Sequence, residues 1–463
     1  MVSFGSGIGR IGVRVFHAPE GAGVARAITP NAHLNPTNRM SVYDLAKNKI
    51  EGKIVTIRTD FNGTADSGKI KSETRIDAAL PTIKYMLDNG AKQIILLSHN
   101  GRPQEELKKG TPLDKVAKKN TLEPVAENLT RKLGLPVAFV KMEADKENAS
   151  IARVIVSENS RLDPRDQSEN VSEQAAYAME ITRYYKPDIF VMDGFSVTHR
   201  DEADTTVLAR LMREAGKPAV AGHQLVKEYD FLINKLVKNP KGPFVVFLGG
   251  AKVSGPEGKM VFIKKLMEKA DKVVIGGAMA YPFLVALGMK PGKNPLGIDE
   301  VAQNNLKNDV EAARELLADP AAKGKLVIPN TLIGADHSKL TVSQEEAPAN
   351  FVMRDVSMAG TLAQIKQEIP LVGTVFFNGP FGVFEDFQSQ GTNEIFMFMS
   401  WATRSGAITV IGGGETDKAA KQYKNVIGGE PVLTHKTTGG GASAELIRFG
   451  TLPGFEAMDK KEV

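Results

Sequence analysis

The first half of the sequence contains polar and basic residues whose types and positions suit the binding of a small polyanion. Each follows a predicted strand or begins a predicted helix, and together they are Asp60, Asn62, Arg75, His99, Arg102, Arg161 and Arg200. The guanidinium group of arginine is a planar fork of donors that matches the oxygens of carboxylates and phosphates. A single arginine of this kind is usually a solvated or structural charge. Because so many follow strand ends, the set predicts a basic pocket for a small anion.

The second half contains glycine-rich segments directly after its predicted strands. They are Gly249-Gly250, Gly276-Gly277, Gly412-Gly413-Gly414 and Gly439-Gly440-Gly441. Glycine lets backbone N–H groups approach a phosphate, and the N-terminus of a following helix favours negative charge. One such segment is an ordinary turn, whereas four in one domain favour nucleotide or phosphate binding. The P-loop pattern is absent from the sequence, so a nucleotide site of another kind is expected. A basic pocket combined with a nucleotide site suits phosphoryl transfer.

These residues need a scaffold that brings strand ends together, and the sequence alternates short apolar runs with longer helical patterns. The first half predicts strands at 53–58, 93–97, 137–140, 153–156 and 188–192, with helices at 75–89 and 122–133. The second half predicts strands at 243–248, 272–275, 325–328, 373–377 and 407–411. This alternation is typical of parallel sheets covered on both faces. The expected fold class is α/β, with two doubly wound parallel-sheet domains joined by a hinge helix.

The composition is that of an ordinary globular chain and excludes several classes of protein. Its 463 residues have a net charge of +5 and are 42% hydrophobic and 24% charged, which suits two or three domains. The small, mixed charge predicts no nucleic-acid partner. No membrane span is expected, because no apolar run approaches the ~18 residues that a spanning helix needs. The absence of cysteine excludes disulfides, thiolate zinc sites and cysteine nucleophiles.

The N-terminal residues 1–39 form a separate segment with four arginines and Glu20 as its only acid. Their charge superficially suits an organelle transit segment. The glycine pattern of residues 5–12 could be mistaken for a dinucleotide fingerprint, but no apolar strand precedes it. An NAD-dependent dehydrogenase also fits nothing downstream. We expect residues 1–39 to be an extension that is flexible or docks a protein partner.

Eight ordered motifs between about Met40 and Met458 resemble those of the phosphoglycerate kinase family. They are Thr59-Asp-Phe-Asn62, Ser98-His-Asn-Gly-Arg-Pro103, Glu158-Asn-Ser-Arg161, Asp193-Gly-Phe-Ser-Val-Thr-His-Arg200, Leu248-Gly-Gly-Ala-Lys-Val-Ser254, Asn378-Gly-Pro-Phe-Gly-Val-Phe-Glu385, Gly412-Gly-Gly-Glu-Thr416 and Thr438-Gly-Gly-Gly-Ala-Ser443. The resemblance implies a two-domain hinge enzyme of glycolysis. Such an enzyme moves a phosphoryl group between 1,3-bisphosphoglycerate and Mg-ADP, giving 3-phosphoglycerate and ATP.

The resemblance also implies a division of the chain and a role for each matching residue. The implied parts are an N-terminal extension (1–39), a phosphoglycerate-binding domain (40–222), an interdomain helix (223–238), a nucleotide-binding domain (239–445) and a C-terminal segment returning to the first domain (446–463). Phosphoglycerate would bind Asp60, Asn62, Arg75, His99, Arg102, Arg161 and Arg200. The nucleotide, ATP or ADP, would bind Gly250, Lys252, Gly276, Gly277, Asn378, Glu385, Gly414, Glu415 and Thr416. The implied catalytic residues are Arg75, Lys252, Gly413 and Gly414, and Glu415 would be the ligand for Mg²⁺.

Several residues depart from the family pattern, and four of these departures bear on the site. Pro256 stands in the position of a second lysine that contacts the transferring phosphoryl group, and Glu415 replaces the metal-binding aspartate. Arg354 replaces a small residue of the adenine wall, and Glu202 replaces the last histidine of the Asp193 motif. Lys259 is the only nearby replacement for the missing cation. On a helix beginning at Pro256 it would have to reach about 5 Å back along the axis.

These departures leave two hypotheses of different class. The first is an active phosphoglycerate kinase, for which we expect a cytoplasmic location. The second is a catalytically impaired phosphoglycerate kinase-like protein with a binding or structural role in an assembly. Its location would be an organelle or a cytoskeletal assembly such as a ciliary axoneme.

Overall fold

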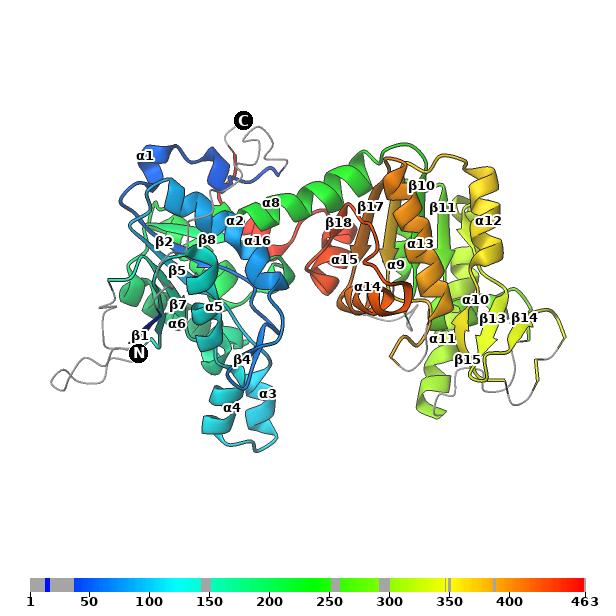
Figure 1. Ribbon diagram of the computed structural model, residues 1–463, viewed down its shortest axis with the longest axis horizontal. Helices are drawn as coiled ribbons and strands as arrows, with labels where there is room; N and C mark the ends of the chain where they lie inside the picture. Colours follow the sequence, from blue (N-terminus) through cyan, green and yellow to red (C-terminus); the bar gives the residue numbers. More distant parts are fainter. Residues whose placement is uncertain are drawn as a thin grey trace. The chain divides into compact units, whose positions relative to one another are not determined.

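The computed structural model describes residues 13–16, 37–142, 151–250, 259–290, 300–345, 347–348, 351–385 and 389–461. The chain divides into two compact units. Unit 1 contains the residues up to Tyr229 together with those from Thr451 onward, and unit 2 is Asp230–Gly450. Each unit is built around a mainly parallel sheet with helices against it (Figure 1). The predicted two-domain α/β fold is therefore confirmed.

Unit 1 contains a seven-stranded sheet in the order β1-β6-β7-β5-β2-β8-β9. Its strands are β1 (Val13–Phe16), β2 (Ile54–Arg58), β5 (Gln93–Leu97), β6 (Val137–Val140), β7 (Val154–Ser157), β8 (Ile189–Met192) and β9 (Ala219–Ala221). Every pairing from β6 to β9 is parallel. The strands β6, β7 and β8 are buried at every residue, as expected when helices cover both faces. A separate two-stranded ribbon joins β3 (Ala65–Asp66) to β4 (Lys69–Ile70).

The strand β1 comes from the segment that the sequence predicts to be an extension. Val13–Phe16 pairs antiparallel with Val137–Val140 of β6. A strand at the edge of a sheet exposes unpaired backbone groups, and β1 covers those of β6. These four residues therefore belong to the sheet of unit 1 rather than to a free arm. Residues 1–12, which include the whole glycine pattern of 5–12, and residues 17–36 lie outside the described residues.

The helices of unit 1 differ in length, and the longer ones bury an apolar face. The helices are α1 (Lys47–Ile50), α2 (Thr74–Asp88), α3 (Pro103–Lys108), α4 (Leu113–Asn120), α5 (Glu123–Leu133), α6 (Val171–Tyr185), α7 (Leu208–Glu214), α8 (His223–Tyr229) and α16 (Pro453–Glu456). In α5, Val125, Leu129 and Leu133 recur at four-residue spacing and are buried. The helix ends where Gly134 adopts a left-handed conformation and donates its N–H to Thr130.

Unit 2 contains a six-stranded sheet in the order β12-β11-β10-β16-β17-β18, with all pairs parallel. Its strands are β10 (Phe244–Leu248), β11 (Lys272–Ile275), β12 (Leu326–Val327), β16 (Thr374–Asn378), β17 (Ile408–Gly412) and β18 (His435–Lys436). A small antiparallel sheet, which the sequence did not predict, joins β13 (Thr331–Gly334) to β14 (Lys339–Thr341) and β15 (Met353–Val356). Edge-to-face contacts of Phe247 and Phe377 with neighbouring rings fill the core.

The helices of unit 2 are α9 (Met260–Met267), α10 (Ala280–Ala286), α11 (Glu300–Ala318), α12 (Ala359–Glu368), α13 (Gln390–Arg404), α14 (Gly414–Ile427) and α15 (Gly440–Phe449). The segment 223–238 is helical, but it changes type. It is α-helical over His223–Tyr229 and a π-helix, η6, over Asp230–Lys238. The two units divide where the helix type changes. Among the described residues, no helix combines the length and apolar character needed to cross a membrane.

The C-terminal residues pack within unit 1. Phe455 is buried and contacts the ring of Tyr229, with ring centroids 5.5 Å apart. Gly454 donates its N–H to the carbonyl of Thr198 at 2.8 Å, and Asp459 donates to Ala219 at 2.9 Å. These bonds join the end of the chain to β9 and to the loop after β8.

We therefore predict that Phe455→Ala destabilises unit 1 without destabilising unit 2. Removing a buried ring should lower the free energy of unfolding of unit 1 by about 3 to 5 kcal/mol. Trp401 is the single tryptophan of the chain and lies in α13 of unit 2. In urea, circular dichroism should therefore show an early transition that Trp401 fluorescence does not follow. A matching shift of both signals would contradict the assignment.

Candidate active site

The basic residues of unit 1 are placed by the carboxyl ends of neighbouring parallel strands. Asp60 follows β2, His99 follows β5, and Arg161 follows β7 after a short loop. These three strands are adjacent in the sheet, so their ends meet at the edge where open α/β sheets bind ligands. The pKa of His99 is well below its ordinary value because of burial and then because of four arginines, namely Arg161, Arg58, Arg75 and Arg200. The imidazole of His99 is therefore neutral among converging cations.

The Asp60 carboxylate holds Arg75 at this edge. Arg75, in the first turn of α2, forms an ion pair with Asp60, and Ser196 donates its hydroxyl to the same carboxylate. Burial alone would raise the pKa of Asp60, but Arg75 and Ser196 outweigh it and keep the pKa below its ordinary value. Asp60 is therefore ionised and orients Arg75, whose side chain is 29% exposed.

Asn62 and Arg102 are placed differently from the other members of the set. Asn62 accepts the N–H of Gly101 at 2.9 Å through its side-chain oxygen, so it fixes the loop after β5. Arg102 has a side chain that is 72% exposed and pairs with Glu105 at 3.1 Å. The structure therefore brings Asp60, Arg75, His99, Arg161 and Arg200 together but leaves the Arg102 guanidinium at the surface.

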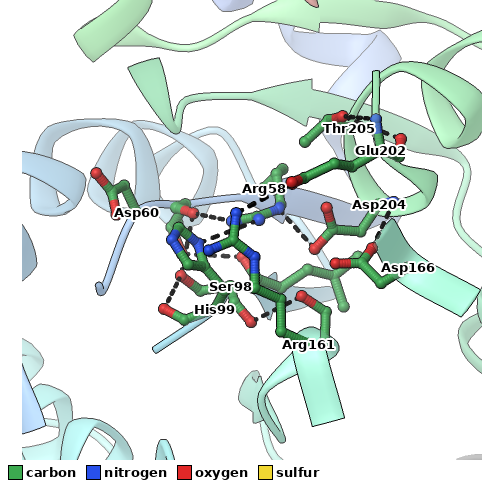
Figure 2. A network of polar contacts seen from close by, with 12 residues as sticks. Arg58, Asp60, Ser98, His99, Arg161, Asp166, Glu202, Asp204 and Thr205 are labelled. Atoms are coloured by element: carbon green, nitrogen blue, oxygen red, sulfur yellow. Dashed lines mark hydrogen bonds and ion pairs between the residues drawn. The ribbon is translucent and has the colours of Figure 1, made fainter. Parts of the chain in front are cut away.

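Arg161 and Arg200 share one buried carboxylate. The Glu202 Oε1 atom lies 3.1 Å from Arg161 and 3.4 Å from Arg200. Gln167 donates its side-chain amide to the same oxygen at 2.6 Å. Burial lowers the pKa of Arg161, and the charge of Glu202 opposes that shift. Figure 2 shows Arg161 and Glu202 beside His99 and Arg58.

The sequence analysis missed Arg58, which lies at the centre of the network in Figure 2. Its side chain is fully buried and forms an ion pair with Asp204 at 2.6 Å. It also donates to the carbonyl of Thr59 at 2.6 Å and lies 3.3 Å from Nδ1 of His99. A charged residue that ends a buried and largely apolar strand was the available signal.

The carboxyl group of Asp166 lies near Arg58 and has a shifted pKa. Burial, followed by the charges of Asp204 and Glu202, raises this pKa well above its ordinary value.

In unit 2, glycine-rich turns follow β10, β11 and β17, and their close packing explains why these positions need glycine. A Cβ on Gly249 would lie 2.3 Å from the Pro380 carbonyl, and one on Gly276 would lie 2.1 Å from the Phe381 ring. Gly250 and Gly277 have φ angles of +112° and +63°, which favour glycine. The predicted residues Lys252 and Pro256 belong to 251–258, which lie outside the described residues.

Two helix N-termini meet at the same edge of unit 2. α14 begins at Gly414 and α15 at Gly440, and a Cβ built on Gly440 would lie 3.7 Å from the Gly414 nitrogen. The hydroxyl of Thr416 accepts the N–H of Gly379 at 2.8 Å, which joins the loop after β16 to the first turn of α14. Backbone donors at paired helix N-termini favour an anion such as a phosphate.

Lys259 places its ammonium group among these loops. Its Nζ donates to the Gly249 carbonyl at 2.5 Å and to the side-chain oxygen of Asn378 at 3.0 Å. Helix α9 begins only at Met260, with Lys259 at its N-cap. The predicted helix start at Pro256 lies outside the described residues. Burial lowers the pKa of Lys259 to about 8.

The carboxylates of Glu415 and Glu385 are exposed near the same loops. Glu415 lies in the first turn of α14 and pairs with Lys418 at 2.9 Å, and Glu385 adds to the acidic surroundings that raise the pKa of Lys418. Mg²⁺ commonly binds one or two carboxylates together with phosphate oxygens and waters. Glu415 is an accessible oxygen donor and fits such a site. Arg354, in β15, has an exposed side chain, and its carbonyl accepts the N–H of Val383 at 2.9 Å.

The fold and these two clusters of residues define a class of protein: two α/β units, one with basic side chains at the carboxyl edge of its sheet and one with glycine-rich turns beside helix N-termini. The family model for phosphoglycerate kinase matches residues 45–448. The chain is 38% identical over 426 residues to phosphoglycerate kinase of Lactobacillus acidophilus, covering 89% of this chain and 98% of that relative. The chain therefore belongs to the phosphoglycerate kinase family.

Other comparisons agree with this assignment. The phosphoglycerate kinase of Fervidobacterium nodosum is 36% identical over 429 residues and spans 89% of this chain and 97% of its own length. The solved phosphoglycerate kinase structure of Coxiella burnetii has a TM-score of 0.69 at 29% identity, covering 90% of this chain and 98% of its own. The solved structure from Pyrococcus horikoshii, at 23% identity and a TM-score of 0.69, supports the fold.

The depressed pKa of Lys259 predicts a pH dependence of stability. Its folded value of about 8 lies below the reference value of 10.5, so the unfolded chain binds more protons between these pH values. The free energy of unfolding of unit 2 should therefore rise from about pH 8 to pH 10.5, and Lys259→Met should remove that rise. Urea unfolding followed by Trp401 fluorescence measures this difference.

Lys264→Met is the matched control. Lys264 lies on the neighbouring helix α9 and forms an ion pair with Glu315 at 2.6 Å. This variant should keep the rise of the unaltered chain. An equal rise in Lys259→Met would show that Lys259 does not titrate in this range.

Proposed function

We propose that this protein is an active phosphoglycerate kinase. It moves a phosphoryl group from the carboxyl phosphate of 1,3-bisphosphoglycerate to ADP, giving 3-phosphoglycerate and ATP, and it also runs in reverse. The observation that carries this proposal is the position of Lys259, whose ammonium group lies among the glycine-rich loops of unit 2. A cation there replaces the one that Pro256 lacks, and it favours an enzyme over an impaired relative.

Unit 1 would bind the phosphorylated acid. Arg75, Arg161 and Arg200 provide planar guanidinium groups that match phosphate and carboxylate oxygens. His99 is neutral and can donate or accept a hydrogen bond without adding charge. Asn62 orients the Gly101 loop at the same edge. The ion pair with Asp60 orients the Arg75 side chain before the acid binds, so less side-chain entropy is lost on binding.

Unit 2 would bind the adenine nucleotide. Gly250, Gly276 and Gly277 let the backbone approach the ligand, and Asn378, Glu385 and Thr416 supply polar groups around it. The N-termini of α14 and α15, at Gly413-Gly414 and Gly440, would bind the phosphates. Lys252 is a further proposed phosphate ligand. Glu415 would hold Mg²⁺, which shields the charge of the nucleotide phosphates during transfer.

Lys259 would stabilise the charge on the transferring phosphoryl group. In the free chain it bonds to neutral oxygens of Gly249 and Asn378, and burial makes its charge costly. A phosphate placed beside it relieves that cost and keeps the lysine protonated. Arg75, Lys252, Gly413 and Gly414 remain the other predicted catalytic residues.

The alternative, an impaired protein with a binding or structural role, would require a partner for the N-terminal segment. Pairing of Val13–Phe16 with β6 uses part of that segment inside unit 1, which favours the enzyme. The docking partner, the cytoplasmic location and the alternative location in an assembly all stay predictions.

We predict that Arg75→Ala weakens binding of 3-phosphoglycerate by about 30-fold or more. The substitution removes a guanidinium group and leaves the Asp60 carboxylate unpaired, where it repels an anion. Isothermal titration calorimetry on the full chain measures the affinity. Arg102→Ala should cost less, since its side chain is at the surface. Equal losses in the two variants would contradict the proposed pocket.

We predict that Lys259→Met lowers kcat by about 100-fold or more, because a cation at the migrating group acts mainly in the transition state. A coupled ATP assay measures turnover, and Lys264→Met should retain the activity of the unaltered chain. Full turnover in Lys259→Met would exclude this role for Lys259. A chain that binds both ligands yet shows no turnover would favour the impaired alternative.

A further inference from the structure

The two arginines of the basic pocket that share Glu202 already have an anion in the free chain. The Glu202 carboxylate is 5% exposed and lies against Arg161 at 3.1 Å and Arg200 at 3.4 Å. It thus occupies donors that the proposed function assigns to the substrate. Among the other arginines at this edge, Arg58 pairs with Asp204 and Arg75 with Asp60.

The position of Glu202 is fixed by its own backbone. Its N–H donates to the hydroxyl of Thr205 at 3.2 Å, at the start of the π-helix η5 (Ala203–Val207). Gln167 also donates its side-chain amide to the Glu202 carboxylate at 2.6 Å. These contacts hold the Glu202 carboxylate against Arg161 and Arg200 in the free chain. Glu105 on Arg102 is different, because its side chain is 57% exposed and solvent screens its charge.

Because Glu202 is buried, its charge interacts strongly with the neighbouring groups. Arg161 is 4% exposed on its side chain, and a buried cation without a counter-ion is costly. Glu202 supplies that counter-ion in the free chain, and an anionic ligand would supply it in the complex. The binding free energy of the ligand therefore reflects only the difference between its interaction with the arginines and that of Glu202. The nearby Glu202 carboxylate also repels the ligand.

We propose that Glu202 is a built-in competitor for the substrate anion, which sets a low affinity for the phosphorylated acid by occupying Arg161 and Arg200. This inference rests on the proposed function of unit 1. It makes Glu202 a residue that tunes affinity through the two arginines rather than a catalytic residue.

The test is calorimetric titration of 3-phosphoglycerate into the full chain, Glu202→Gln and Glu105→Gln. Glutamine keeps the size and one acceptor of Glu202 but removes its charge. The dissociation constant should fall about tenfold in Glu202→Gln, which is about 1.4 kcal/mol, and should be unchanged in Glu105→Gln. Damage to the fold would weaken binding, so a gain in affinity is specific to competition. Equal or weaker binding by a folded Glu202→Gln chain overturns the proposal.

A crystal structure of the unaltered chain with 3-phosphoglycerate gives a second test that does not depend on a variant. Ligand oxygens should contact Arg161 or Arg200, and at least one of the two Glu202 ion pairs should be broken. A bound ligand with both pairs intact overturns the proposal even though unit 1 binds the acid.

Inorganic phosphate separates this proposal from the proposed function. If neither the unaltered chain nor Glu202→Gln binds 3-phosphoglycerate, the proposed function of unit 1 fails. In that case tighter binding of inorganic phosphate by Glu202→Gln would still support competition by Glu202. Equal phosphate binding by the two chains would overturn it.

Discussion

Parallel pairing of strands is the constraint on which both sites depend. In a parallel sheet every carboxyl end points to the same edge, so loops that are distant in the sequence become neighbours. In unit 1 this brings together the residues after β2, β5 and β7, and in unit 2 the turns after β10, β16 and β17. Asn378, at the end of β16, pairs with Leu248 of β10 and Gly412 of β17. It thus joins the glycine turns on either side of it.

The second constraint is the cost of burying charge. Unit 1 meets it by giving its buried cations carboxylate partners, so that Arg58 lies on Asp204 and Arg161 on Glu202. Unit 2 meets it differently at Lys259, where carbonyl and amide oxygens hold the ammonium group and the pKa falls to about 8. Among the described residues, the two sites therefore differ in their electrostatics, since the buried arginines of unit 1 have carboxylate partners and Lys259 contacts neutral oxygens.

The departures from the family pattern have unequal consequences in the structure. Glu415 remains an accessible carboxylate in the first turn of α14. Pro256 lies outside the described residues, and the substitute proposed for its missing charge, Lys259, lies at the N-cap of α9 beside the Gly249 carbonyl. The departure at Glu202 alters the site most, because it introduces a buried negative charge between two arginines. A sequence motif records such a change as one substitution, although its effect depends on what surrounds the side chain.

The sequence by itself determined most strands of the two large sheets, the α/β class and the glycine-rich turns, because alternating apolar runs and glycine positions are local features. Most predicted strands agree with the structure to within a residue or two, as with 93–97 and β5. Tertiary structure alone decided which charges meet. Arg58 and Asp204 are 146 positions apart, and Lys259 reaches Asn378 across 119. It also decided that Val13–Phe16 joins β6 and that Arg102 faces solvent. The pairing of charges and strands and the burial of side chains depend on the packed sheet, and local sequence composition does not determine them.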